Sequence, residues 1–279
     1  MRHMVRNRVA FSVVSLLLLV HLAGCRHQSH SRDFQSPPIS QKVSIQERDG
    51  ASASAMASGG VTVVGGFGAD GSTLDAVTVL GADNAVSNPV TLDAGRARHG
   101  ACVIDGGARV VVAGGVGGSR SAQEALSSTR IVDPVRGTVV AGPDLPEALV
   151  EPRAVFWDNG TPADLTDDAV FLIGGLDASG APSGLVLKWT LSPAPGSMGI
   201  SGNLATSRSD HTITLCPDHD GTWKIWVIGG DGGSGPIAST ELIDPATARP
   251  PWAIRPPRRP SWSREAWVPH SPRWPRPSS

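Results

Sequence analysis

The stretch VVVAGG at residues 110–115 decides the fold, because three β-branched residues and an alanine run directly into a pair of glycines. An apolar, mostly β-branched run that ends at glycine is typical of a buried strand followed by a turn. The same arrangement occurs three more times, as VTVVGG (61–66), VFLIGG (170–175) and IWVIGG (225–230). The first glycines of successive pairs are 49, 60 and 55 residues apart. This period predicts one β-rich structural unit per repeat.

Each glycine pair is preceded by an arginine, and two of the arginines are followed three positions later by a histidine. Downstream of two pairs lies a segment that ends in Asp-Pro, STRIVDP at 128–134 and STELIDP at 239–245. Equivalent positions in a repeat usually have equivalent structural roles. The positions to which we assign such roles are Arg48, Arg96, His99, Arg153, Arg208, His211, Gly65, Gly66, Gly114, Gly115, Gly174, Gly175, Gly229 and Gly230.

The pattern resembles the kelch repeat, which has an Arg-x-x-His start, an apolar strand ending in Gly-Gly and a period near ~50 residues. The resemblance implies an all-β, kelch-like β-propeller with one four-stranded blade per repeat. About four blades are visible, at 48–95, 96–152, 153–207 and 208–248, and they could form an incomplete ring. The first repeat lacks the histidine, and Val132 and Ile243 replace an aromatic residue common in the family. A β-sandwich or another β-solenoid remains the alternative.

Residues 1–24 contain the segments of a signal peptide in the usual order, a basic segment followed by an apolar run. Three arginines precede an apolar run at 9–20, which is shorter than the ~20 residues that a membrane-spanning helix needs. The following Leu-Ala-Gly-Cys resembles a bacterial lipobox, which implies lipidation of Cys25 and a membrane anchor at the cell envelope, with Arg26 favouring the outer membrane. An ordinary secretory signal or an uncleaved anchor is the alternative. The polar residues 25–47 predict a flexible tether.

Residues 249–279 differ sharply from the rest of the chain. They contain seven arginines and one glutamate, whereas residues 25–248 contain 14 basic and 24 acidic residues. Nine prolines in residues 250–279 exclude a central strand, because proline donates no ladder hydrogen bond. Three interpretations stay open: out-of-frame translation, a natural disordered tail, and a basic Trp/Arg segment for anionic surfaces.

The sequence contains no set of residues that matches a known catalytic site. A Gly-x-Ser-x-Gly motif and a phosphate-binding Gly-Lys-Ser/Thr ending are absent, and the lack of tyrosine excludes Tyr–Cys copper and Tyr-nucleophile chemistry. Four aspartates at 158, 164, 167 and 168 predict a solvated acidic loop, with Ca²⁺ binding as the alternative. Cys102 and Cys216 are expected to be buried and free. We therefore expect no metal, cofactor or catalytic residue.

The sequence thus favours an exported, lipid-anchored binding or scaffolding module for a protein or glycan at the envelope. Export argues against nucleic acid as a partner. Two alternatives remain: a carbohydrate-active propeller enzyme such as a sugar mutarotase, and a truncated, non-functional fragment of a longer kelch protein.

Overall fold

A computed structural model of the chain describes residues 43–161, 164 and 166–247. Within these residues the fold is all-β, as the sequence predicts: it has 17 strands, one 3₁₀ turn at Asp105–Gly107 and no α-helix. Accordingly, this part of the chain contains no helix of the length and apolarity needed to span a bilayer. The signal peptide, Cys25, most of the tether and residues 249–279 lie outside the described residues.

The strands form four main antiparallel sheets and one hairpin. Sheet 1 consists of β1 (Ser52–Ala55), β2 (Val61–Val64), β3 (Ala76–Leu80) and β4 (Val86–Thr91). Sheet 2 consists of β5 (Gly100–Ile104), β6 (Arg109–Ala113), β9 (Thr129–Asp133) and β10 (Thr138–Ala141). Sheet 3 consists of β11 (Arg153–Trp157), β12 (Ala169–Ile173), β13 (Leu185–Thr190) and β14 (Ser197–Asn203). Sheet 4 has only β15 (Thr212–Pro217), β16 (Trp223–Ile228) and β17 (Thr240–Ile243).

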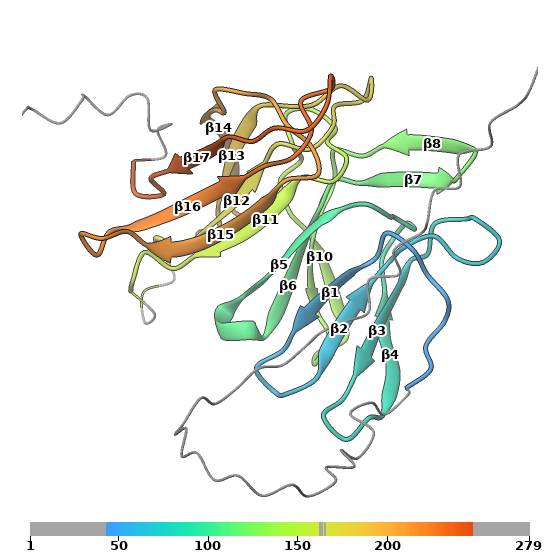
Figure 1. Ribbon diagram of the computed structural model, residues 1–279. Coiled ribbons are helices and arrows are strands. Elements are labelled where there is room, and N and C mark those ends of the chain that lie inside the picture. The colour runs from blue at the N-terminus through green and yellow to red at the C-terminus, as the bar shows by residue number, and fades with distance from the viewer. Residues whose placement is uncertain (1–42, 162–163, 165, 248–279) are drawn as a thin grey trace, which may run out of the picture.

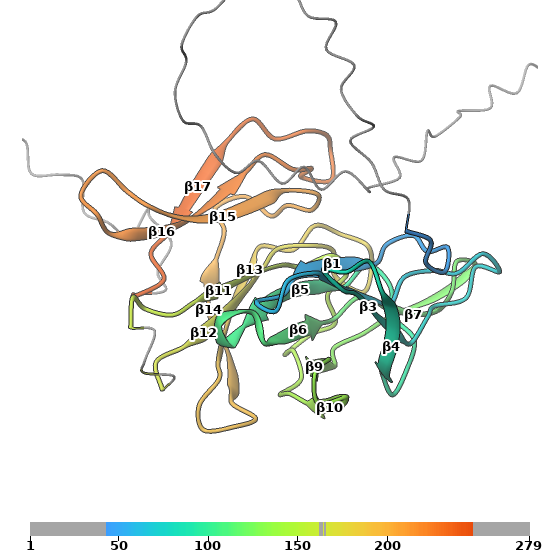
Figure 2. The same cartoon turned by 90° about the horizontal axis from the view of Figure 1, so that it is seen from below.

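The four sheets follow one another in an open series (Figure 1). The first strand of each sheet lies beside the first strand of the next, so that β1 contacts β5, β5 contacts β11, and β11 contacts β15. Figure 2 shows sheet 4 at one end of this series. No closed ring is seen among the described residues.

Apolar side chains fill the space between successive sheets, which explains why the central strands are apolar on both faces. Val64 and Val77 of sheet 1 pack with Val110 and Val112 of sheet 2. The next two interfaces are built in the same way, from Val111, Ala113, Val170 and Leu172 between sheets 2 and 3, and from Phe171, Ile173, Ile225 and Val227 between sheets 3 and 4. A strand that is covered on both faces needs no polar alternation.

The hairpin of β7 (Val116–Ser119) and β8 (Ala122–Ala125) is an addition that the repeat pattern does not predict. In the sequence it lies between β6 and β9, and in space it reaches back over sheet 1. Arg120 lies in the turn between β7 and β8, where it forms an ion pair with Asp49 at 2.9 Å and lies 4.8 Å from the ring centre of Phe67. The hairpin therefore ties sheet 2 to sheet 1.

Candidate functional site

The glycine pairs form the junctions between successive sheets. The N–H of Gly66 donates to the carbonyl oxygen of Arg96 in the next sheet at 2.8 Å. Gly115 donates in the same way to Leu149, and Gly175 to Arg208, at 2.8 and 3.0 Å. Each sheet thus holds the next through one equivalent backbone hydrogen bond.

The first glycine of a pair is required by its conformation and by close approach of the next sheet. Gly65 has φ +60°, and a Cβ there would lie 2.2 Å from the carbonyl oxygen of Arg96. At Gly114, with φ +62°, it would lie 2.4 Å from the carbonyl oxygen of Leu149. A side chain at either position would be strained by its backbone and would push two sheets apart.

Three of the four assigned arginines bind the carbonyl oxygen of the first glycine in their own repeat. Nη1 of Arg48 and Nη1 of Arg96 donate to Gly65 and Gly114, both at 3.3 Å, and Nη1 of Arg208 donates to Gly229 at 2.8 Å. A guanidinium has five donors in a fixed plane, so it can satisfy several carbonyl oxygens at a strand end. These three arginines therefore have a structural role: they satisfy carbonyl oxygens at the strand ends.

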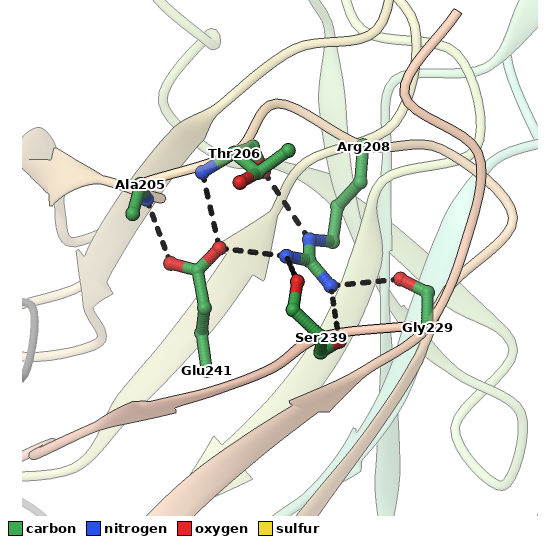
Figure 3. Close-up of polar contacts among 6 residues, drawn as sticks. All are labelled: Ala205, Thr206, Arg208, Gly229, Ser239 and Glu241. Atoms are coloured by element: carbon green, nitrogen blue, oxygen red, sulfur yellow. Dashed lines mark hydrogen bonds and ion pairs between the residues drawn. The ribbon is translucent and has the colours of Figure 1, made fainter. Parts of the chain in front are cut away.

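Arg208 shows the full arrangement (Figure 3). The side chain is fully buried and also donates to the carbonyl oxygen and Oγ of Ser239, both at 3.1 Å. Its Nη2 lies 2.7 Å from Oε1 of Glu241, whose carboxylate also accepts the N–H groups of Ala205 and Thr206. The buried charge is thus both paired and hydrogen-bonded, as stability requires.

Arg153 does not occupy the equivalent position. Its Nε donates to the carbonyl oxygen of His211 at 2.7 Å, and it is the first residue of β11. In each repeat the residue after the arginine position forms an isolated bridge, and in the third repeat that residue is Val150. Leu149 therefore stands where Arg96 and Arg208 stand. Spacing alone misplaced the arginine by four residues, because the third repeat has no arginine at this point.

His99 and His211 lie at equivalent positions, one residue before β5 and β15, and each faces the glycine pair of the preceding sheet. Nε2 of His99 is 2.8 Å from Oγ of Ser52. Burial, followed by the charge of Arg96, lowers the pKa of His99 to about 3. Burial and the charges of Arg153 and Arg208 lower the pKa of His211 to about 4. Both imidazoles are therefore neutral near pH 7.

A second set of equivalent positions was missed by the sequence patterns. The residue just before the histidine position has a left-handed backbone in every repeat, with φ +67° at Gly50, +56° at Arg98, +56° at Glu151 and +52° at Asp210. The corners are adjacent: the N–H of Arg98 donates to Gly50, and the N–H of Glu151 donates to Arg98, both at 2.7 Å. Charged residues in this conformation are uncommon and strained, and such strain clusters at functional sites.

We call Arg98, Glu151 and Asp210 the corner cluster. Nε of Arg98 lies 2.5 Å from Oε1 of Glu151, and both side chains are partly exposed. Partial burial, the charge of Glu151 and a hydrogen bond with it raise the pKa of Asp210, while Arg153 and Arg98 oppose this shift. One cation and two carboxyl groups, one of which holds its proton to a higher pH than usual, therefore meet at one end of the first strands.

The other sequence candidates are not gathered into a site. Asp158 and Asp164 accept hydrogen bonds from the N–H groups of Gly160 and Thr166 in their own turns, at 3.0 and 2.9 Å. No group of three or more metal-ligating side chains occurs within the described part of the chain. Cys102 and Cys216 are both free and half-buried, and burial raises the pKa of the Cys102 thiol to about 12.

A shallow hollow of about 230 Å³ lies between loops of sheets 3 and 4, lined in part by Trp157, Trp223 and Asp244. Ligand pockets are usually larger, at roughly 300–1,000 Å³. The corner cluster is therefore the stronger candidate.

No family model matches the chain, and no curated protein matches its sequence. The corner cluster is therefore interpreted from its geometry alone. The sequence signal that could have found it is a charged residue two positions after the arginine, at Arg98 and Asp210.

Proposed function

We propose that the chain is an exported, lipid-anchored module of kelch-like propeller architecture that binds a protein or a glycan at the bacterial envelope. The architecture is supported by four sheets in series whose first strands are neighbours, with one sheet inside each sequence repeat. Export and anchoring rest on the order of charge, apolar run and Leu-Ala-Gly-Cys in residues 1–25.

The observation that carries the binding role is the corner cluster. Equivalent corners of three consecutive sheets bring Arg98, Glu151 and Asp210 together, although a glycine, as at Gly50, would suit each backbone better. Charged groups held at a structural cost just before the start of rigid strands suit recognition, since little entropy is lost on binding. A glycan or a polar peptide offers both donors and acceptors, which match one guanidinium and two carboxyl groups.

The test uses glycine variants, because glycine removes the side chain and relieves the left-handed backbone. Purified full-length protein in detergent micelles is applied to a glycan array and crosslinked in envelope extracts. Arg98→Gly and Asp210→Gly should lose specific binding while their stability stays unchanged or rises by about 1 kcal/mol. Asn84→Gly is the matched control, because Asn84 also has a left-handed backbone, at φ +65°, in a turn of sheet 1. Unchanged binding by both corner variants would reject the corner cluster as the site.

A second candidate, a sugar mutarotase, is favoured by the carboxyl pair. Burial and the neighbouring Glu151 raise the pKa of Asp210. Mutarotation removes a proton from the anomeric hydroxyl and delivers one to the ring oxygen, so an acid and a base suffice and nothing is consumed. Anomer exchange followed by NMR over a panel of sugars, with folded protein, decides this: no acceleration rejects the enzyme, and acceleration lost in Asp210→Gly supports it.

A further inference from the structure

The outer face of sheet 4 differs from the corresponding face of every other sheet. Ile228 is 44% exposed, whereas the residues at the same position before the other glycine pairs, Val64, Ala113 and Ile173, are fully buried. In the earlier sheets this position faces the next sheet. Thr212 and Thr240 pair directly with Ile228, so they share its face, and both are exposed. Sheet 4 thus presents an interface on which no other sheet of the described residues is docked.

The glycine pair of sheet 4 also makes no contact to a following sheet among the described residues. A Cβ at Gly229, with φ +64°, would have the carbonyl oxygen of Ile237, at 3.7 Å, as its nearest described neighbour, whereas the equivalent Cβ at Gly65 would lie 2.2 Å from the next sheet. The N–H of Gly230 forms no hydrogen bond within residues 43–247 as described, while Gly66, Gly115 and Gly175 each donate to the following sheet. The N–H of Gly230 and the space beside Gly229 are therefore available to a further sheet.

Sheet 1 has the acceptor that would complete this junction, the carbonyl oxygen of Arg48. The carbonyl oxygens of the arginine position accept from the preceding glycine pair in sheets 2, 3 and 4, but that of Arg48 accepts no hydrogen bond in the described part of the chain. In sheet 2, Ala101 and Val103 of β5 pack toward the preceding sheet. Their equivalents in β1, Ala53 and Ala55, are exposed, whereas Val63 and Thr78, further across the same face, are buried, so the open part of this face lies along β1. Small apolar residues there let another sheet approach closely.

We infer that the outer face of sheet 4 docks on the outer face of sheet 1 of a second copy of this chain. The contact continues an interface that the chain already builds three times, with Gly230 donating to Arg48 of the other copy. If both copies engage reciprocally, two four-sheet arrays close into a ring of eight sheets, which lies within the four to eight blades of known propellers. Residues 249–279 are a poor substitute, because they contain no glycine and nine of them are proline.

The first experiment measures the oligomeric state of the full chain in dodecyl maltoside micelles by analytical ultracentrifugation. We expect a two-copy species. Ile228→Arg places a charge on the docking face and should raise the dissociation constant at least tenfold. Ile200→Arg is the matched control, since Ile200 is 60% exposed on β14 of sheet 3, and it should dissociate like the unaltered chain. A single-copy species at all concentrations, or equal effects of both variants, overturns the inference.

A second measurement identifies what touches the face. A photoreactive benzoylphenylalanine replaces Thr214, which is exposed and pairs with Trp226. Adducts to β1 or β2 of another copy, identified by mass spectrometry, support the inference. Adducts within the same chain to residues 249–279, or to its own sheet 1, overturn it, and so does the absence of adducts. Circular dichroism checks that each variant is folded.

Discussion

Two glycine substitutions with almost the same backbone conformation should have very different effects on stability. Gly65 and Gly229 have φ +60° and +64°, so alanine at either position incurs the left-handed penalty of roughly 1–2 kcal/mol. At Gly229 the nearest described atom, the carbonyl oxygen of Ile237, lies 3.7 Å from the new Cβ, which is ordinary contact, so we expect no further loss. At Gly65 the Cβ would be 2.2 Å from the Arg96 carbonyl oxygen. Separating the sheets adds about 1–3 kcal/mol of overpacking, and the lost Gly66 hydrogen bond adds about 1–3 kcal/mol.

Gly65→Ala should therefore cost about 3–8 kcal/mol and Gly229→Ala about 1–2 kcal/mol, by the sum of those effects. Urea denaturation followed by tryptophan fluorescence gives both free energies of unfolding. The protein concentration is kept below that at which copies associate, so that the Gly229 side stays open. Equal losses, within about 0.5 kcal/mol, would refute the conclusion that the fourth junction is empty and the first is closed.

Further outcomes follow from the same structure. Arg208→Met leaves Glu241 without its cation and three carbonyl oxygens without this donor, and it should cost about 3–5 kcal/mol in urea denaturation, whereas Arg153→Met, which loses one hydrogen bond, should cost about 1 kcal/mol. Because the pKa of His99 is about 3 in the folded chain and near ~6.5 when unfolded, its contribution to stability is present above pH ~6.5 and is lost as the pH falls toward 3. The slope is at most about 1.4 kcal/mol per pH unit, and His99→Gln should remove it in denaturation curves taken between pH 8 and 4. Cys25→Ser should abolish incorporation of labelled acyl chains in bacterial expression, and unchanged labelling would contradict the lipobox interpretation.

Periodicity predicted the all-β class and the place of the glycine pairs, because a strand followed by a sharp turn has a strong local signal. The histidine positions were also found by spacing. The arginine of the third repeat was misplaced, since Leu149 has an apolar side chain that does not mark the repeat in the sequence, and Arg153 lies only four residues away. The corner cluster was missed because its members have different chemistry at one backbone position. Only the register of the sheets brings Arg98, Glu151 and Asp210 together.

The hairpin of β7 and β8 has a mechanical consequence. It gives sheets 1 and 2 a second attachment, through the bridge between Ser72 and Ser119 and the ion pair of Arg120 with Asp49. In a single copy, and among residues 43–247 as described, sheet 4 contacts one neighbouring sheet only. When each unit contacts only its neighbours, a linear array detaches from its weaker end. A chain pulled between its ends should therefore release sheet 4 first, then sheet 3, and lose sheets 1 and 2 last in a single step.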